Sequence, residues 1–359
     1  TSFPIGGGAV YIFRYNGSQW IQEQKIIPSD VQTISDFGVS IALEGGKLVV
    51  GVSSRQLGTP LGERYGKIYY FHFNGIQWVE RQQLSAPVPV DSDAFGRTFA
   101  MHKSKLIVLS ASNGVVESKY LIYQLEASSW HLAAEITQSN IPSNFILGHG
   151  VAICNETIAM SAGHSFNPST LEWVPACLIF KQVNASWELQ QTIENHLPAA
   201  DILGFGSLLA LFGDTLVLGV AELNSTGLAG GGSYVYKSNG LNYEIRQVIP
   251  AGIGEPGAAH QTSISLCENH LIIGAPHDGT NLPTAGHARI LTFPCLLNQF
   301  TRGDSNLDGL VNMLDVTILL EKTFFATELA NCEDSLDTDD SGTINLVDAT
   351  RLLGYLFAG

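Results

Sequence analysis

The chain has 359 residues, 45% of them hydrophobic, with 37 glycines and 14 prolines. This composition is typical of a globular protein rich in strands and turns, with room for one large and one small domain, and it excludes a disordered chain. Eighteen basic and 33 acidic side chains give a net charge of −15, which argues against a nucleic-acid partner because a phosphate-binding surface needs clustered Lys and Arg.

The N-terminus and the apolar segments predict a chain that does not span a membrane. It opens with Thr1 and no charged-then-apolar leader, so we expect any signal peptide to have been removed or to lie outside the given sequence. The most apolar window, residues 207–223, is interrupted by Gly213-Asp214 and is shorter than the roughly 20 residues of a membrane span. It is better interpreted as a hairpin.

Residues 1–294 consist of a repeat with two half-units. One half-unit recurs at spacings of 58, 54, 56 and 55 residues, measured between Phe37, Phe95, His149, Phe205 and His260. The other is seen in GAVYIFRYNGSQWIQEQKI at 8–26 and in GKIYYFHFNGIQWVERQQL at 66–84. Each half-unit joins two short β-branched and aromatic runs through a polar or glycine turn, which predicts a hairpin. Two hairpins give four strands per repeat.

A four-stranded sheet of this size cannot bury both faces alone, so neighbouring repeats must stack, and radial stacking gives a β-propeller. The repeats resemble the FG-GAP family of integrin α-like propellers. The residues that carry the resemblance are Phe37-Gly38, Phe95-Gly96, Phe205-Gly206, the half-kept His149-Gly150, and Gly274-Ala275-Pro276. The expected fold class is therefore mainly β.

The repeat count predicts five to six blades. The chain begins in a second half-unit at 8–27, runs through full repeats from about Phe37 to Ile249, and ends with a partial or complete blade at 260–294. The family resemblance favours seven blades, so we expect the C-terminal portion of a longer propeller or an open ring.

An aromatic residue recurs at one position of the second half-unit. Aromatic rows can stack on sugar rings, but a periodic aromatic is more often a core residue between blades, and we favour the core. The residues concerned are Trp20, Trp78, Trp130, Trp187 and Tyr243. Neither an HExxH nor a GxSxG motif is present. Sequons for N-glycosylation occur at Asn16, Asn155, Asn184 and Asn224.

Two signals overlap in TRGDSNLDGLVNMLD at 301–315. Arg302-Gly303-Asp304 is the tripeptide that adhesion receptors recognise, whereas the Asp and Asn alternation ending in Asp-Gly is typical of a metal loop. The metal pattern recurs 33 residues later without a second Arg-Gly-Asp. A lone copy is compatible with a solvated turn, but two copies in register favour a metal loop that turns Asp304 inward.

Both loops carry oxygen donors at positions 1, 3, 5, 9 and 12, Gly at position 6 and a backbone carbonyl at position 7. This pattern suits Ca²⁺, a hard cation with six to eight oxygen ligands, rather than Zn²⁺, which prefers Cys or His. We therefore expect two Ca²⁺ ions. The predicted ligands are Asp304, Asn306, Asp308, Leu310, Asn312 and Asp315 in the first loop, and Asp337, Asp339, Ser341, Thr343, Asn345 and Asp348 in the second.

Each loop runs directly into a segment with helical leucine spacing, VTILLEKTFF at 316–325 and ATRLLGYLF at 349–357. Position 12 is Asp rather than the Glu of an ordinary EF-hand. The duplication resembles a type I dockerin over residues 302–359, after a linker at 295–301. The resemblance implies a small α-helical module with two EF-hand-like calcium loops that binds a cohesin-type partner. The chain departs from the best-studied dockerins at loop positions 10 and 11, where Met313-Leu314 and Leu346-Val347 replace hydroxyl residues.

The five cysteines lack metal-ligand spacing. Cys295 and Cys332 each precede a predicted loop, so we expect a disulfide between them, with Cys154 and Cys177 as a second candidate pair. Residues 302–359 contain 11 acidic and 3 basic side chains, a net charge of −8, so more than half of the excess negative charge lies there.

These patterns predict a secreted or cell-surface, non-catalytic binding protein. Its propeller would present a face to a protein or glycan ligand, and its C-terminal module would dock to a cohesin-like protein. The alternative is a propeller enzyme, a polysaccharide lyase or glycoside hydrolase, anchored through the dockerin; it requires convergent titratable residues in one pocket. A third interpretation makes the C-terminal module a structural cap on the propeller.

Overall fold

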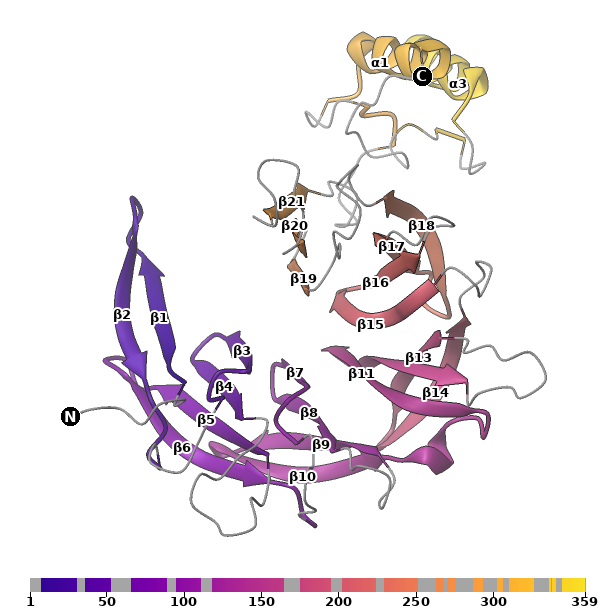
Figure 1. Ribbon diagram of the computed structural model, residues 1–359. Helices are drawn as coiled ribbons and strands as arrows, with labels where there is room; N and C mark the ends of the chain where they lie inside the picture. The colour runs from indigo at the N-terminus through magenta and orange to yellow at the C-terminus, as the bar shows by residue number, and fades with distance from the viewer. Residues whose placement is uncertain are drawn as a thin grey trace. The chain divides into compact units, whose positions relative to one another are not determined.

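The computed structural model of the chain describes residues 8–30, 36–52, 66–88, 95–110, 118–164, 175–194, 202–223, 229–250, 263–267, 270–275, 287–292, 302–305, 310–325, 336, 338–339 and 344–358 (Figure 1). It divides into two compact units. Unit 1 comprises residues 1–261 and 277–285, and unit 2 comprises residues 262–276 and 286–359.

Unit 1 begins with an antiparallel hairpin, which is followed by four antiparallel sheets of four strands. The hairpin is β1 (Val10–Tyr15) and β2 (Trp20–Ile26). The first two four-stranded sheets are β3 (Ser40–Glu44), β4 (Lys47–Val52), β5 (Lys67–Phe73), β6 (Trp78–Ser85), and β7 (Phe99–His102), β8 (Lys105–Ser110), β9 (Lys119–Glu126), β10 (Ser129–Ile136). A short 3-10 helix, η2 (Gln138–Asn140), follows.

The next two sheets are β11 (Phe145–Cys154), β12 (Thr157–His164), β13 (Pro175–Val183), β14 (Ser186–Glu194), and β15 (Ile202–Phe212), β16 (Thr215–Leu223), β17 (Ala229–Ser238), β18 (Tyr243–Pro250). In every sheet the strands lie side by side in chain order. This meander is the strand order of a propeller blade.

Unit 2 contains one three-stranded sheet and two helices. The sheet is β19 (Ser263–Cys267), β20 (His270–Ala275) and β21 (His287–Thr292). The helices are α1 (Met313–Phe325) and α3 (Leu346–Ala358). The sheet β19–β21 and the four four-stranded sheets of unit 1 together give a mainly β, five-bladed propeller arrangement. The predicted count of five to six blades is confirmed, whereas a longer ring of seven stays a prediction.

Asparagine–glycine turns connect the last two strands of several sheets. The Oδ1 of Asn74 accepts hydrogen bonds from the backbone N–H groups of Ile76 and Gln77, both at 2.9 Å, and Gly75 has a φ of 97°. An Asn side chain can close such a turn, and glycine tolerates positive φ. The residues of the turn itself therefore determine the hairpin. Asn16 and Asn239 form the same turn.

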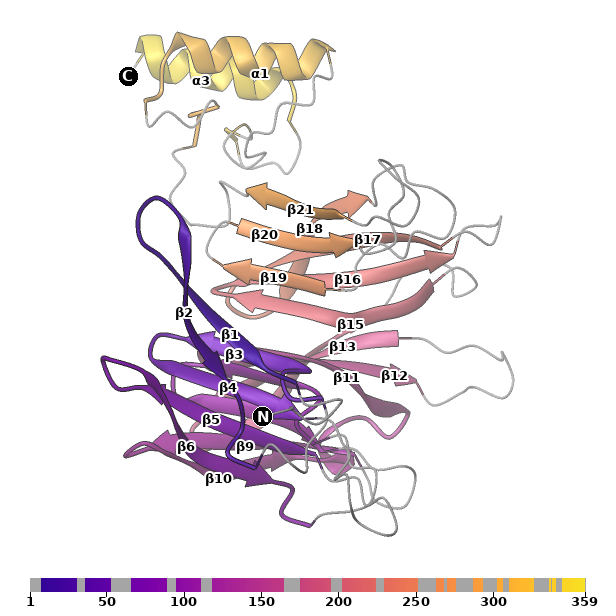
Figure 2. The same ribbon diagram turned by 60° about the vertical axis from the view of Figure 1, so that its left-hand side comes forward.

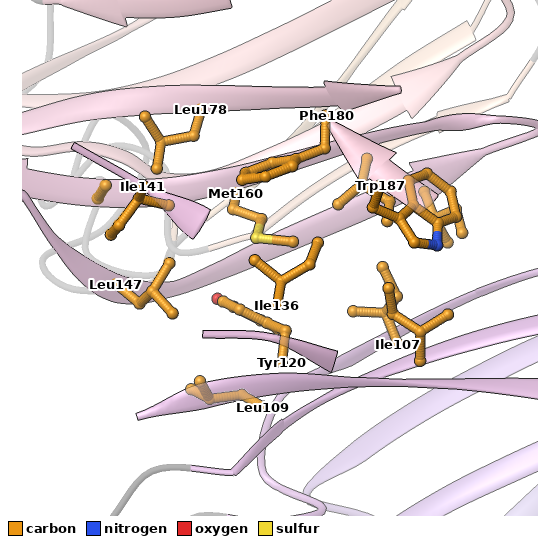
Figure 3. Packing of buried hydrophobic residues seen from close by; sticks show 14 of the residues in the cluster. Ile107, Leu109, Tyr120, Ile136, Ile141, Leu147, Met160, Leu178, Phe180 and Trp187 are labelled. Atoms are coloured by element: carbon orange, nitrogen blue, oxygen red, sulfur yellow. The ribbon is translucent and has the colours of Figure 1, made fainter. Parts of the chain in front are cut away.

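The hydrophobic core lies between consecutive blades. Figure 3 shows one such layer, in which Tyr120 from β9 and Ile136 from β10 face Met160 from β12 and Phe180 from β13. These side chains belong to a single buried cluster. Within unit 1, the apolar faces of consecutive sheets that meet in this way cover each other, as the repeat predicts.

The Phe-Gly dipeptide packs where successive blades meet. Phe95 is fully buried, and Gly96 has a φ of 83°. A Cβ atom at Gly96 would collide with the backbone carbonyl oxygen of Lys67. Glycine is therefore required here both for its backbone conformation and for close approach of two main chains.

The prediction of a buried aromatic at one position of each repeat is correct for Trp78, Trp130, Trp187 and Tyr243. It is wrong for Trp20, whose side chain is 69% exposed. The four buried residues each pack against the preceding sheet, as Trp78 does against β1 and β2. Trp20 lies on the first hairpin, whose corresponding face is exposed.

The second candidate disulfide is also wrong, because Cys154 and Cys177 are free and buried. They lie on β11 and β13, which are separated by β12. The linker at 295–301 and the predicted pair Cys295–Cys332 lie outside the described residues. No helix in the described part of the chain combines the length and apolarity of a membrane span.

Candidate functional site

The two predicted loops lead into α1 and α3, which lie side by side in both views of the chain (Figures 1 and 2). Val316 and Leu319 of α1 share a buried cluster with Ala349 and Leu352 of α3 and with Leu336, which lies outside both helices. The leucine spacing that predicts two helices is therefore confirmed. Each helix begins two residues before the aspartate at loop position 12.

In the first loop this aspartate is a buried acceptor of backbone hydrogen bonds. The carboxylate of Asp315 is fully buried; its Oδ1 accepts from the N–H of Ser305 at 2.7 Å and its Oδ2 from the N–H of Asn312 at 2.8 Å. The Oδ1 of Asn312 accepts from the N–H of Leu314 at 2.8 Å. Asp315 therefore ties the start of the loop to the start of α1.

The second loop repeats this arrangement. The fully buried Asp348 accepts from the N–H of Thr338 at Oδ1 and from the N–H of Asn345 at Oδ2, both at 2.8 Å. The Oδ1 of Asn345 accepts from the N–H of Val347 at 2.8 Å. The 33-residue sequence repeat thus corresponds to a repeated three-dimensional structure, with matching donors and nearly equal distances.

The Arg-Gly-Asp tripeptide is not displayed as an open loop. Asp304 is buried, whereas Arg302 is exposed. Gly303 has a φ of 94°, and a Cβ there would lie 2.7 Å from Cδ1 of Leu352 on α3. This packing holds the main chain against the helix and directs Asp304 away from solvent. Arg302 lines a shallow pocket together with Arg351 and Tyr355.

The structure describes seven of the twelve predicted calcium ligands: Asp304, Leu310, Asn312, Asp315, Asp339, Asn345 and Asp348. The other five lie outside the described residues: Asn306, Asp308, Asp337, Ser341 and Thr343. Within the described part, no group of three or more His, Cys, Asp or Glu residues gathers at a metal-binding distance. The two calcium sites stay a prediction.

The chemistry of the described donors nevertheless fits a hard divalent cation. Asp304 and Asp315 are two buried acidic residues in one loop, and carboxylate oxygens are among the ligands that Ca²⁺ takes. All predicted donors are oxygen atoms, as Ca²⁺ requires.

Apolar side chains are exposed at matching positions of the two loop–helix segments. This symmetric apolar set consists of Met313 and Leu346, Leu314 and Val347, and Phe324 and Phe357. The first two pairs directly precede the buried aspartates. The sequence identifies these pairs as departures from the dockerin pattern but does not predict that all six side chains face solvent.

A polar cluster on unit 1 was not predicted. His102 contacts Oε1 of Glu44 through Nδ1 at 3.5 Å and Oδ1 of Asn155 through Nε2 at 3.2 Å. The Sγ of Cys154 lies 4.0 Å from His102 Nε2 and accepts from the N–H of Gly213 at 3.2 Å. Burial raises the pKa of the Cys154 thiol, which favours its neutral form. The cluster joins the first-hairpin turns of four sheets, and no sequence motif marks it.

Comparison with known proteins identifies the repeat. The family model described as "FG-GAP repeat" matches residues 20–71. No curated protein sequence matches the chain. This match includes Phe37-Gly38 and covers β2, β3, β4 and most of β5.

Solved structures with a similar arrangement are distant in sequence. They include a prolyl endopeptidase (12% identity, TM-score 0.40, 80% of this chain and 39% of that chain). A Trypanosoma rangeli sialidase in complex with the inhibitor DANA has 10% identity and a TM-score of 0.43, over 80% of this chain and 52% of that chain. The periplasmic gluconolactonase PpgL of Pseudomonas aeruginosa has 11% identity and a TM-score of 0.39, over 82% and 97%.

The chain spans 39% of the endopeptidase and about half of the sialidase. At TM-scores below 0.5, none of these similarities carries a functional argument. What the comparisons establish is that residues 20–71 carry an FG-GAP repeat, within a chain whose sheets have a five-bladed β-propeller arrangement.

Proposed function

We propose that this chain is an extracellular binding protein, secreted or attached to a cell surface, with a dockerin-like module at 302–359. The module docks to a cohesin-type protein when its two loops hold Ca²⁺. The propeller presents an interaction face to a protein or glycan ligand. The propeller does not take part in docking.

The observation that carries the proposal is the alternation of exposed and buried residues at the helix starts. Leu314 and Val347 are exposed, and the residues that follow them, Asp315 and Asp348, are fully buried. Exposed apolar side chains that recur in a fixed pattern mark an interaction surface. Because each aspartate is fixed by two backbone hydrogen bonds, the neighbouring apolar pair is held in a defined orientation.

Calcium supports this surface by ordering the loops. Asp304 and Asp315 would hold one ion together with the remaining predicted donors of the first loop, and Asp348 would serve the second loop. The bound ion supplies positive charge that compensates the buried carboxylates, so its binding free energy contributes to folding of the loops. Removal of calcium is therefore expected to disorder the apolar surface and abolish docking.

The test uses the full chain and an immobilised type I cohesin domain. We expect retention in calcium and release in EDTA. The double variant Leu314→Asp/Val347→Asp should lose retention, while Ile76→Asp, in an exposed turn of unit 1, should keep it. Retention that survives EDTA, or no retention of a chain that binds two calcium ions by calorimetry, contradicts the proposal.

The enzyme alternative concerns unit 1 and has its own test. It proposes a lyase or glycoside hydrolase carried to polysaccharide by the dockerin-like module. Incubation of the full chain with a panel of polysaccharides, followed by detection of new reducing ends or unsaturated products, would support it if product forms. The cap interpretation predicts instead that no cohesin binds and that EDTA lowers the melting temperature of unit 1.

A further inference from the structure

A small pocket in unit 2 brings two arginine side chains together. Arg302, which precedes the first loop, and Arg351 on α3 both line it. The main chain at Gly303 packs against Leu352 of α3, so the residue before it is held beside the helix. The pocket has a volume of about 170 Å³. Pockets for drug-sized ligands measure roughly 300–1,000 Å³, so this one fits a single side chain or a group of similar size.

The lining of the pocket favours a negatively charged group. Arginine stays charged, and its planar fork of N–H donors matches the two oxygens of a carboxylate. Tyr355 also lines the pocket and carries a hydroxyl that can donate. The hydroxyl of Thr338 is already used, because its Oγ1 donates to the backbone carbonyl oxygen of Asp348 at 2.8 Å. Within the described part of the chain, no carboxylate forms an ion pair with Arg351.

These two arginines stand out in a strongly acidic module. Residues 302–359 contain 11 acidic and 3 basic side chains, and two of the three basic ones line this pocket. Two bound Ca²⁺ ions would still leave a net charge of about −4, which lowers the local concentration of free anions. A carboxylate carried by a docked protein is instead brought to the pocket by the other contacts of that protein. The charge distribution therefore favours a protein side chain over a free anion.

The fold does not require these arginines, because the other half of the duplicated module lacks them. At the spacing of 33 residues, Arg302 corresponds to Ser335 and Arg351 corresponds to Ile318. The buried aspartates of both halves nevertheless accept equivalent backbone hydrogen bonds at the same distance. A structural role that both halves share therefore does not account for the two arginines.

The pocket adjoins the proposed docking surface. Val347, Arg351 and Tyr355 follow one another at intervals of four residues on α3, so their side chains lie along one face of the helix. All three side chains are exposed. Val347 belongs to the symmetric apolar set. A protein that covers Val347 can therefore reach Arg351 one turn further along α3.

We propose that this pocket binds the carboxylate of an acidic side chain of the docked protein, an inference that rests on the proposed docking function. Arg302 and Arg351 hold the carboxylate through charge-assisted hydrogen bonds, which are roughly twice as strong as neutral ones. Val311 and Leu352 supply the apolar part of the lining. The apolar set provides contact area, and the arginine pocket selects partners that present an acidic residue at the matching place.

The first experiment tests the pocket without any partner protein. NMR spectra of the arginine Nε–H groups of the full chain are recorded in calcium while a capped peptide with one glutamate is added at constant ionic strength. The signals of Arg302 and Arg351, assigned from Arg302→Gln and Arg351→Gln, should shift and saturate. The same peptide with glutamine should leave both signals in place. Equal shifts with both peptides, or no shift, would refute the proposal. Inorganic phosphate that shifts the signals when the glutamate peptide does not would also refute it and assign the pocket to a free anion.

The second experiment measures the affinity of the full chain for an immobilised type I cohesin domain in calcium. Arg302→Gln and Arg351→Gln should each lower the affinity about tenfold, because each removes charge-assisted hydrogen bonds. Arg246→Gln, on β18 of unit 1, removes the same charge from an exposed side chain and should bind as the wild type does. Calcium titration of the variants should still give two ions, which shows that the loops are intact.

An affinity that neither pocket variant lowers, or that Arg246→Gln lowers equally, would overturn the assignment of the pocket to the docked protein. If the wild type does not bind the cohesin domain at all, the proposed docking function fails. The peptide titration alone then decides whether the pocket binds a carboxylate, so the two failures are distinguishable.

Discussion

Gln24 on β2 brackets the backbone of Trp78 on β6 with both ends of its side-chain amide. Its Nε2 donates to the Trp78 carbonyl oxygen at 3.0 Å, and its Oε1 accepts from the Trp78 N–H at 2.8 Å. The glutamine stands four residues after Trp20, and Gln82 and Gln191 stand four residues after Trp78 and Trp187. We call this arrangement a glutamine clamp. It provides hydrogen-bond partners for both the backbone N–H and the backbone C=O of the aromatic residue at the start of the last strand of the next sheet.

Removing one clamp should destabilise unit 1. Gln191→Ala leaves the part-buried N–H and C=O of Tyr243 without their side-chain partners, so we expect the free energy of unfolding to fall by about 1–3 kcal/mol. Urea denaturation followed by tryptophan fluorescence measures the change. Gln190→Ala, at the exposed bulge residue next to it, is the matched control and should stay within about 0.5 kcal/mol of the wild type. Equal effects of the two variants would contradict the role of the clamp.

The sheet β7–β10 lacks a glutamine at the clamp position, and introducing one should stabilise the protein. Ala134, four residues after Trp130, occupies the clamp position opposite Trp187 and packs at the edge of the core between these sheets. Ala134→Gln would supply two hydrogen bonds to the Trp187 backbone, so we expect a gain of about 1 kcal/mol in urea denaturation. Ala133→Gln, at the exposed bulge, should give no gain. A loss of stability in Ala134→Gln would show that the core there has no space for the amide.

Alanine substitutions at two glycines with similar φ angles can distinguish the stability cost of a strained backbone angle from the cost of a steric collision. Gly75 has a φ of 97° and open space around the position of a Cβ, whereas Gly96 has a φ of 83° and faces the carbonyl oxygen of Lys67. Gly75→Ala should cost roughly 1–3 kcal/mol through its backbone angle alone. Gly96→Ala should cost about 1–3 kcal/mol more, because the added methyl overpacks the contact. Denaturation of both variants measures the difference, and equal costs would contradict the collision.

The sequence predicts features that depend on neighbouring residues. The turn at Asn74-Gly75 follows from local hydrogen bonding and positive φ, and the helices α1 and α3 follow from leucine spacing. Spacing also identifies the repeat, because stacking of equal units imposes one period on all of them. These features require no knowledge of distant contacts.

Burial of Trp20 could not be predicted in this way, since it depends on whether another sheet covers the face. The glutamine clamp was also missed, because it joins residues more than 50 positions apart and an isolated Gln carries no signal. In the loops, the buried aspartates follow the predicted pattern, but the exposure of the apolar pairs beside them depends on how α1 packs against α3.

Alkaline pH should destabilise the blades. Burial raises the pKa of Tyr123 to about 12, with a further contribution from the negative charge of Glu135, and burial also raises the pKa of Tyr236 to about 12. A raised folded-state pKa means that the folded protein keeps the phenol proton longer than the unfolded chain. The stability contribution is therefore complete below the unfolded pKa of 10.0 and is lost as pH rises through about 12.

Urea denaturation at increasing pH, together with the tyrosinate absorbance, measures this loss. Tyr123→Phe removes one titrating group, so its stability should fall less steeply above pH 10 than that of the wild type. An unchanged slope in Tyr123→Phe would show that Tyr123 does not contribute to the alkaline transition.

The last prediction concerns Arg302-Gly303-Asp304. Asp304 is buried beside the loop that Asp315 organises, so under the proposed function it serves calcium rather than an adhesion receptor. Calcium titration calorimetry on the full chain should give a stoichiometry of two for the wild type and for Arg302→Ala, and of one for Asp304→Ala. Loss of a metal belongs to the changes that cost more than about 4 kcal/mol, so α1 should also lose helical signal.

Asp337→Ala is the matched control, because it removes position 1 of the second loop, where no Arg-Gly-Asp occurs. It should likewise reduce the stoichiometry to one, since the two loops share the same hydrogen-bond arrangement around Asp315 and Asp348. If Arg302→Ala and Asp304→Ala both abolish attachment of integrin-bearing cells while each variant still binds two calcium ions, the tripeptide acts in adhesion and the assignment of Asp304 to calcium is wrong. If Asp304→Ala and Asp337→Ala each lower calcium binding and Arg302→Ala does not, Asp304 is a calcium ligand equivalent to Asp337. The burial of Asp304 then follows from its place in the loop and not from the tripeptide.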